Sequence, residues 1–311
     1  TRAPGESRKE ASLRGVRPAA LALLLALSPS SLFAQPLSER YTALGTTIVT
    51  TSDHTMFPHP KRASGHVYEG KTYPADPHYG DRTVVIFVPK GFRPGETTDL
   101  VFYFHGWRND VDRTLATFRI AEQVAASGVN AVLVLAEGPK DAPDSFGGKL
   151  EEAGVFSSLV ADVLATLKER GVVEKPRPGS IVLAGPSGAY RVISFILLRG
   201  GLTENVREVY LFDALYGELE KFARWVEHSR GRLVVIHTLG GGTRTRTLDF
   251  IDDLRAWGVP FAEVAESAVT AGLLRNNRIG FIESPLAHDD VVAAQDDGRK
   301  ELIIQALTNL K

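Results

Sequence analysis

Short apolar runs alternate with longer amphipathic stretches from residue 83 to the end of the chain. Runs such as 132–135 and 234–236 are apolar at every position, so both faces of each strand must be covered. Fully apolar strands are typical of parallel sheets that carry helices on both faces. The alternation therefore predicts one α/β domain at residues 83–311, with a doubly wound, mostly parallel sheet and helices on both of its faces.

The predicted elements follow from these runs. Candidate strands lie at residues 83–89, 99–105, 130–136, 180–184, 208–212, 232–238 and 278–283. Candidate helices lie at residues 111–126, 151–170, 190–198, 214–228, 248–257 and 291–307.

The first 34 residues have the layout of a secretory signal peptide. A basic segment precedes an apolar run at 19–27, and small, turn-forming residues then lead to Ala34. The apolar run is too short to cross a bilayer, and no other stretch is long and apolar enough. We therefore predict cleavage near Ala34 and a secreted or periplasmic protein without a transmembrane anchor. The alternative is a disordered or amphipathic N-terminal arm.

Residues 35–82 differ from the rest of the chain. They are rich in Thr, His, Pro, Gly and Tyr and show little periodicity. We predict an irregular N-terminal arm, or an edge hairpin, packed on the α/β domain.

The composition excludes several classes of function. The net charge of −1 offers no basic surface for nucleic acid. The chain has no cysteine, which rules out disulfides and thiol chemistry within it.

The segment 181–191 points most directly to chemistry. An apolar strand ends in Gly185-Pro186-Ser187-Gly188-Ala189 and passes at once into an apolar stretch that can be a helix. A serine flanked by small residues at a strand-to-helix turn is typical of a nucleophile elbow. The alternative for such a Gly-x-Ser-Gly segment is an ordinary tight turn.

Partners for a nucleophilic serine are present at other strand ends. A serine hydroxyl needs a base, an acid that orients the base, and donors for the oxyanion. His288 follows the last predicted strand and is the candidate base, while Asp213 follows the strand at 208–212 and is the candidate acid. The backbone N–H of Gly188 and that of Gly106 or Trp107 are the candidate oxyanion donors.

The chain resembles the α/β-hydrolase superfamily, whose members carry Ser, Asp and His in this chain order. The resemblance rests on four features taken together: Phe104-His105-Gly106-Trp107, the elbow around Ser187, Asp213 and His288. The resemblance covers residues 83–311. It implies Ser187 as nucleophile, His288 as general base and acid, and Asp213 as its orienter, with no cofactor and no metal.

The sequence departs from the superfamily pattern at two places. Ala189 replaces the last glycine of Gly-x-Ser-x-Gly, and Asp213 stands one strand earlier than the commonest position of the acid. Asp249 and Asp289 are therefore alternative acids. Asp213 can also be read as a helix cap, and His288 as a helix-start residue.

Further residues are predicted near the site. His105, Tyr190 and Tyr216 are expected to line the substrate, with His105 belonging to the oxyanion loop rather than acting as a base. Trp107 and the two tyrosines offer an apolar or ring-binding surface. The breaker-rich loop 137–148 is a candidate substrate-shaping loop.

Two weaker patterns have alternative interpretations. The run Gly240-Gly241-Gly242-Thr243 is expected to form a tight turn at the edge of the site, with phosphate binding as the alternative. His54, His59, His66 and His78 cluster in the arm without the spacing of a metal site, and zinc binding is the alternative for this cluster.

Together these patterns predict an exported serine hydrolase that cleaves a carboxylic ester of a small molecule or a polymer. An amide or peptide hydrolase on the same residues is the first alternative. A catalytically silent binding protein with this fold is the second.

Overall fold

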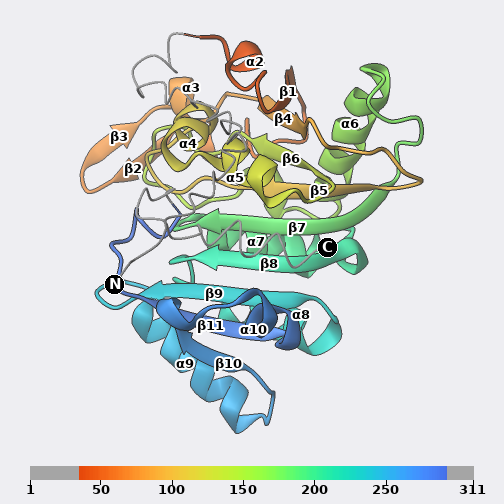
Figure 1. The fold of residues 1–311 in the computed structure, drawn as a ribbon. Coiled ribbons are helices and arrows are strands. Elements are labelled where there is room, and N and C mark those ends of the chain that lie inside the picture. The colour runs from red at the N-terminus through yellow and green to blue at the C-terminus, as the bar shows by residue number, and fades with distance from the viewer. Residues whose placement is uncertain (1–34, 293–311) are drawn as a thin grey trace, which may run out of the picture.

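The computed structural model describes residues 35–292 (Figure 1). The predicted signal peptide and most of the helix expected at 291–307 lie outside these residues. The main sheet of the described part has nine strands in the order β1-β4-β6-β5-β7-β8-β9-β11-β10. They span β1 Gly45–Thr51, β4 Thr83–Pro89, β5 Thr98–Tyr103, β6 Ala131–Ala136, β7 Pro178–Pro186, β8 Val206–Phe212, β9 Arg232–Thr238, β10 Ala262–Ala265 and β11 Ile279–Ser284.

The sheet is parallel from β6 to β10 and antiparallel at its other edge, where β4 pairs with β1 and with β6. In β6 every residue is buried, as expected for a strand covered on both faces. The predicted fold class, a doubly wound and mostly parallel sheet, is confirmed.

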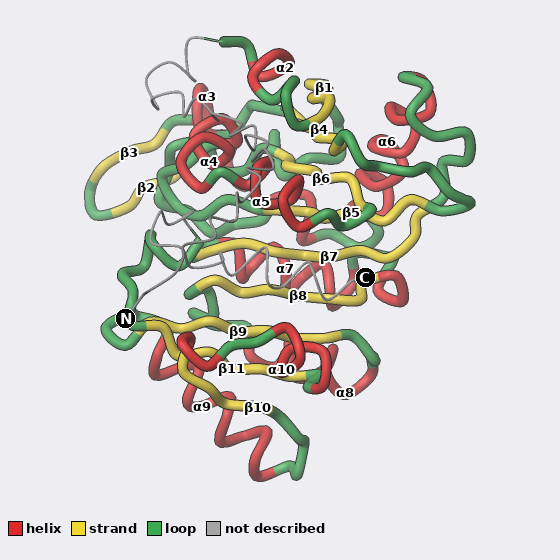
Figure 2. Tube along the Cα trace, viewed as in Figure 1, coloured by secondary structure: helices red, strands yellow, loops and turns green. Residues whose placement is uncertain are grey.

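Helices cover the two faces of the sheet (Figure 2). One apolar cluster joins the sheet to α6 (Val155–Glu169), α7 (Ala189–Arg199), α8 (Leu219–His228) and α9 (Arg244–Ala256). The other joins it to α4 (Val111–Phe118), α5 (Ile120–Ser127) and α10 (Ala271–Asn276). Within residues 35–292 no helix is both long and apolar enough to cross a membrane.

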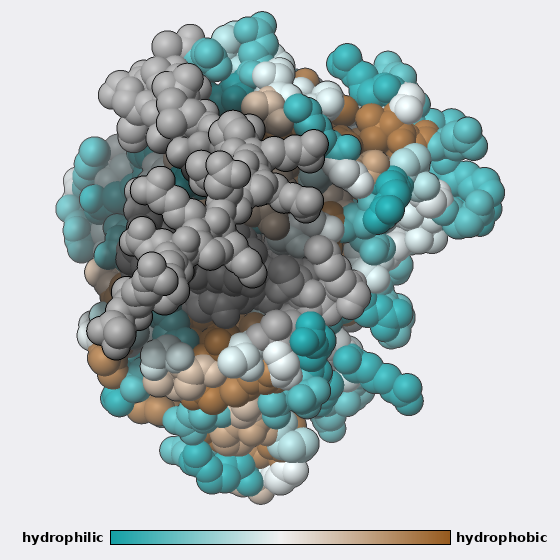
Figure 3. All heavy atoms as spheres, in the orientation of Figure 1, coloured by the Kyte–Doolittle hydropathy of each residue, from teal (hydrophilic) through white to brown (hydrophobic). Residues whose placement is uncertain are grey.

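Apolar residues on the face drawn in Figure 3 gather over β9, β10 and β11. The second cluster is bordered by partly buried apolar residues of β10, α10 and the neighbouring segments, namely Val264, Val269, Leu273 and Leu286. This region is therefore the margin of the second core rather than part of its interior.

Two helices differ from their predicted bounds. The helix predicted at 111–126 is divided into α4 and α5 by Arg119, whose left-handed φ of +51° ends one helix and precedes the next. The helix predicted at 214–228 begins only at Leu219, because Asp213 and Glu218 have positive φ and the residues between them form a non-helical bend, in which Ala214 and Leu215 are buried and Tyr216 is exposed.

The arm at 35–82 is irregular over much of its length but contributes to two sheets. β1 pairs with β4 along seven positions and extends the main sheet. β2 (His66–Tyr68) and β3 (Lys71–Tyr73) form a separate hairpin, while α2 (Leu37–Arg40) and α3 (Ala75–His78) are single turns. The division of the chain at residues 34 and 82 stays a prediction.

Candidate active site

Ser187 lies in the turn between β7 and α7 with a left-handed φ of +52°. A Cβ on Gly185 would stand 2.5 Å from the carbonyl oxygen of Phe104 and 2.6 Å from the Cβ of Ala189. The turn is thus closed so tightly that position 185 must be glycine, while alanine fits at position 189. A non-glycine residue with positive φ at such a turn is a form of strain that concentrates at functional sites.

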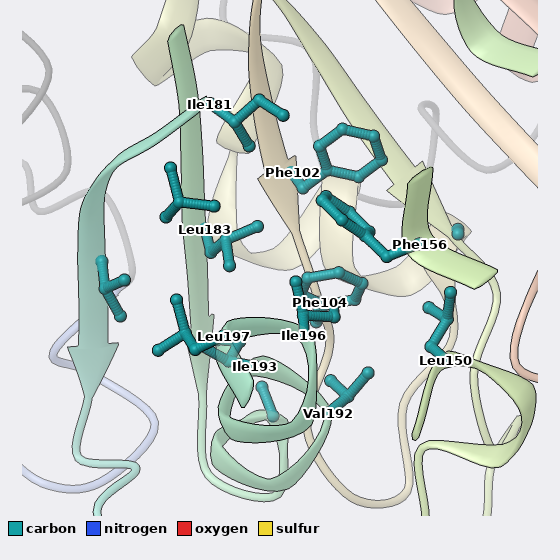
Figure 4. Close-up of a cluster of buried hydrophobic side chains, with 14 of the residues drawn as sticks. Phe102, Phe104, Leu150, Phe156, Ile181, Leu183, Val192, Ile193, Ile196 and Leu197 are labelled. Carbon is teal, nitrogen blue, oxygen red and sulfur yellow. The ribbon is translucent and has the colours of Figure 1, made fainter. Parts of the chain in front are cut away.

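The helix that follows Ser187 is firmly anchored (Figure 4). Val192, Ile193 and Ile196 of α7 are buried in one cluster with Leu183 of β7 and with Phe104, which follows β5. This packing fixes the start of α7 and, with it, the position of the Ser187 backbone.

Asp213 stands at the neighbouring strand end. Phe212, the last residue of β8, is the register partner of Pro186, the last residue of β7, so Asp213 and Ser187 leave the sheet side by side. The Asp213 side chain is fully buried, and its φ of +46° is also left-handed.

Hydroxyl and amide donors from β9 and the following turn hold the buried carboxylate. The Thr238 N–H donates to Oδ1 over 3.2 Å and its hydroxyl donates to Oδ2 over 3.1 Å, while the Thr243 hydroxyl donates to Oδ1. Burial alone would raise the pKa of Asp213, but hydrogen bonds from His288, Thr243 and Thr238 outweigh it and lower the pKa.

The glycine run before Thr243 explains this geometry. A Cβ on Gly241 would stand 2.8 Å from Asp213 Oδ2 and would also collide with the Thr238 hydroxyl. Gly241 therefore lets the turn close around the carboxylate. The sequence indicated a tight turn here, but it did not indicate that the hydroxyls of Thr238 and Thr243 bind Asp213.

His288 follows β11 and meets Asp213. Its Nδ1 lies 2.6 Å from Asp213 Oδ2, and its side chain is 34% exposed. The hydrogen bond to Asp213 raises the pKa of His288 against the opposing effect of partial burial. No hydrogen bond joins His288 to Asp249 or to Asp289 within the described residues.

Ser187 is half-buried, and its hydroxyl makes no hydrogen bond to any residue between 35 and 292. The serine and the Asp213–His288 pair lie at the carboxyl ends of adjacent strands.

The predicted oxyanion donors surround the serine. A Cβ on Gly106 would lie 2.9 Å from the Ser187 Cβ and 3.6 Å from its hydroxyl oxygen, so only a glycine lets this backbone approach. The N–H groups of Gly106, Trp107 and Gly188 donate to no acceptor in the part of the chain that the structure describes. Donors to an oxyanion must be unpaired in this way, which keeps all three N–H groups as candidates.

Comparison with known proteins adds the fold family. No protein-family model and no curated protein matches the chain. The feruloyl esterase module of Clostridium thermocellum is similar in structure over 86% of this chain and 87% of its own, at 10% identity and a TM-score of 0.52. The chain has the α/β-hydrolase fold.

Two other α/β-hydrolase structures resemble the chain equally well. The S-formylglutathione hydrolase of Staphylococcus aureus matches 86% of this chain and 98% of its own, at 11% identity and a TM-score of 0.51. An esterase from Pyrobaculum calidifontis matches 91% of this chain and 88% of its own, at 14% identity and a TM-score of 0.51. At these identities the likeness shows the fold, and the chemistry must be argued from the site residues.

The position of His105 corrects its predicted role. The side chain is 1% exposed, with Nε2 lying 2.9 Å from Glu137 Oε1 and Nδ1 lying 2.8 Å from the Gly106 carbonyl oxygen. A ring buried in this way cannot line the substrate. Burial alone would lower the pKa of His105, but the adjacent Glu137 carboxylate raises it. In this α/β-hydrolase fold His105 instead ties the Gly106 turn to the loop that begins at Glu137.

The two predicted tyrosines lie beside the Asp213–His288 pair. The ring centroid of Tyr216 is 6.3 Å from that of His288 and 6.1 Å from that of Tyr190. Tyr216 is 38% exposed, and burial of its remaining surface raises its pKa to about 12. Both tyrosines are therefore neutral at physiological pH, and Tyr216 presents an aromatic surface near His288.

The histidines of the arm do not converge. Their ring nitrogens face separate partners, since His54 meets Asp162, His59 meets Glu152, and His78 meets the Lys140 carbonyl oxygen. Within residues 35–292 no group of three or more His, Asp or Glu side chains is arranged to hold a metal ion.

A cavity of about 990 Å³ lies away from these residues. It is lined by the C-terminal end of α7, by α8 along most of its length, by the end of α9 with the segment 257–260, and by Arg278, which precedes β11. The ends of α7 and α9 and the start of β11 mark the amino-terminal edge of the parallel strands, whereas Ser187 lies at the carboxyl edge. In open α/β sheets ligands bind outside the carboxyl ends of the strands, so the Ser187 region is the candidate site.

Proposed function

We propose that this protein is a serine hydrolase that cleaves a carboxylic ester through an acyl-enzyme on Ser187. The observation that carries the proposal is the 2.6 Å contact between His288 Nδ1 and the buried Asp213 carboxylate, at the sheet edge where Ser187 stands in a strained turn. An imidazole held in this way presents Nε2 as an acceptor for a serine proton.

The proposed reaction uses only side chains and backbone of this chain. His288 Nε2 takes the proton of the Ser187 hydroxyl, whose oxygen attacks the ester carbonyl carbon. The negative charge on the carbonyl oxygen is accepted by the N–H of Gly188 and by that of Gly106 or Trp107. Asp213 stays ionised and stabilises the imidazolium form of His288.

The tetrahedral intermediate then collapses, and the protonated His288 gives its proton to the departing alcohol. A water molecule, deprotonated by His288, attacks the acyl-enzyme and releases the acid and the free serine. We favour esters because an alkoxide needs less assistance to leave than an amine. The same residues would serve amide or peptide hydrolysis, which is the alternative.

Location forms a further part of the proposal. The layout of residues 1–34 favours export with cleavage near Ala34, and thus a secreted or periplasmic enzyme. The substrate would then be a small-molecule or polymer ester met outside the cytoplasm. Mass spectrometry of the N-terminus after expression in a bacterial host would test this, since an intact N-terminus on exported protein contradicts it.

Fluorophosphonate labelling tests the chemistry, because it requires an activated serine. We expect stoichiometric label on Ser187 by peptide mapping, no label in Ser187→Ala, and a label rate reduced at least about 10³-fold in His288→Ala. A panel of esters and matched amides then separates the two hydrolase alternatives. A folded protein that takes no label would contradict the proposal and favour a silent binding protein.

A further inference from the structure

The indole ring of Trp107 lies against the turn that carries Ser187. A Cβ on Gly188 would lie 2.6 Å from Trp107 Cδ1 and 2.9 Å from Nε1. One edge of the indole therefore rests on the backbone of the residue that follows Ser187. The side chain is nevertheless 39% exposed, so it offers aromatic surface next to the serine.

Two side chains from distant parts of the sequence fix the indole. Its Nε1–H donates to the Ser145 hydroxyl over 2.6 Å, and the Tyr68 ring meets it edge-on at a centroid distance of 5.2 Å. Ser145 belongs to the loop 137–148, and Tyr68 belongs to the β2–β3 hairpin of the arm. A tryptophan held from two sides loses little rotamer freedom when a ligand binds to it.

The arm also holds the loop that carries Ser145. Arg62 Nε donates to Asp144 Oδ2 over 2.6 Å, and the Lys149 N–H donates to the Met56 carbonyl oxygen over 2.9 Å. A Cβ on Gly148 would collide with this same carbonyl oxygen. The arm therefore helps to hold the Trp107 indole indirectly, through its contacts with the loop that carries Ser145.

On the other side of the site, Tyr216 exposes an aromatic surface next to His288. A half-exposed aromatic side chain thus lies beside each of the two proposed groups, with Trp107 next to the turn that carries Ser187 and Tyr216 next to His288. Aromatic rings pair with one another in stacked or edge-to-face geometry and gain more than their buried area alone provides. Neither side chain carries a charge that would favour a charged substrate.

We propose that Trp107 is a specificity-determining residue that stacks an aryl group of the ester, and that Ser145 and Tyr68 are positioning residues for it. The inference rests on the proposed function and deepens it, because it names the substrate class as an ester with an aryl group close to the scissile bond. The aromatic ring can belong to the acyl or to the alcohol part, which the test distinguishes.

The test compares pairs of esters that differ only in aromaticity. Methyl benzoate against methyl cyclohexanecarboxylate probes the acyl side, and benzyl acetate against cyclohexylmethyl acetate probes the alcohol side. The ratio of kcat/KM within each pair is measured by pH-stat for the wild-type protein and for the variants. Comparing ratios between proteins cancels the intrinsic reactivity of each ester.

We expect Trp107→Leu, which keeps the backbone N–H, to lower the aryl preference on one side about three- to tenfold. Ser145→Ala and Tyr68→Leu should lower it less, through KM more than through kcat. Trp257→Leu, which removes a tryptophan that is 58% exposed and lies after α9, is the matched control and should leave both ratios unchanged.

Fluorophosphonate labelling of the same preparations separates the two proposals. If Ser187 is labelled but both ratios are unchanged in Trp107→Leu, or if no aryl ester is cleaved, the inference is overturned and the hydrolase proposal stands. If wild-type Ser187 takes no label, both fail. Should Trp107→Leu not fold, Ser145→Ala decides, because an unchanged ratio in that variant contradicts the inference.

Discussion

His288 Nδ1 lies 2.6 Å from Asp213 Oδ2, although 75 residues separate the two in sequence. Asp213 is fully buried, whereas His288 remains 34% exposed. The contact therefore joins a carboxylate that water cannot reach to an imidazole that a substrate can reach. This difference in exposure is what an acid that orients a catalytic base requires.

Replacing Asp213 by Asn removes the charge and retains the size of the side chain. We expect kcat to fall by about 10⁴-fold, because an amide stabilises the wrong imidazole tautomer and cannot stabilise the imidazolium. Ester turnover and fluorophosphonate labelling measure the loss. Asp249→Asn and Asp289→Asn are matched controls for the alternative acids, and a larger loss in either would move the assignment away from Asp213.

The pH dependence of kcat/KM follows from the pKa of His288. The base must be neutral, and Asp213 raises its pKa above the ordinary value of 6.5. We therefore expect the acid limb of the profile to have its midpoint above 6.5, and to move to lower pH in Asp213→Asn. An acid limb at the same pH in both proteins would contradict the coupling of the two groups.

The same pair contributes to stability within a pH window. The lowered pKa of Asp213 stabilises the fold above the pKa of that group in the unfolded chain, and this contribution is lost as the pH falls through the folded value. The raised pKa of His288 contributes below 6.5 and is lost as the pH rises through its folded value. As the pH rises through the folded pKa of His288, the activity should therefore increase while the contribution of His288 to stability is lost.

Thr243→Val tests whether the glycine-rich turn positions the acid. The substitution removes a hydroxyl that donates to Asp213 Oδ1 within a fully buried environment. We expect the free energy of unfolding to fall by about 1–3 kcal/mol and kcat/KM to fall about tenfold. Chemical denaturation and ester turnover measure the two effects.

Thr247→Val is the matched control for that variant. Thr247 is also fully buried, but its hydroxyl has no hydrogen-bond partner in the described residues. Its removal should therefore be neutral or stabilising. Equal losses in the two variants would show that the Thr243 hydroxyl has no particular role.

Much of the fold could be predicted because its central strands are apolar on both faces. β1 and β10 were not predicted as strands, since edge strands carry exposed positions that break the apolar run. The places of Ser187, Asp213 and His288 followed from their positions after strands, and their catalytic roles stay predictions. The burial of His105 could not be foreseen, because its partner Glu137 begins a loop 32 residues away.

Gly106→Ala probes the close approach to the nucleophile. The new Cβ would lie 2.9 Å from the Ser187 Cβ and 3.3 Å from the Pro186 carbonyl oxygen, so the backbone must shift. We expect the rate of fluorophosphonate labelling to fall at least about 10²-fold, because the oxyanion donors move away. Circular dichroism verifies that the variant folds.

Gly240→Ala is the control for that substitution. A Cβ at position 240 meets nothing within 4 Å, and its backbone has no positive φ. Labelling should therefore remain at the wild-type rate. A wild-type labelling rate in Gly106→Ala would instead show that the Gly106 turn does not supply an oxyanion donor.

Breaking the buried pair of His105 and Glu137 should cost far more stability than breaking an exposed pair of similar length. Their side chains are 1% and 3% exposed, whereas those of Lys175 and Glu96, joined over 2.6 Å, are 49% and 76% exposed. Glu137→Leu leaves the imidazole buried without its partner, and we expect a loss of about 3–5 kcal/mol. Glu96→Gln should cost less than about 1 kcal/mol.

The pH dependence distinguishes this ion pair from simple packing. Burial lowers the pKa of His105, but Glu137 raises it by more, so the net pKa lies above 6.5. The charged pair therefore contributes fully below 6.5, and its contribution is lost as the pH rises through the folded value. Unfolding of wild type and Glu137→Gln at pH 6 and pH 9 measures it. A stability difference that is as large at pH 9 as at pH 6 would show that hydrogen bonding and shape, rather than charge, hold the two residues together.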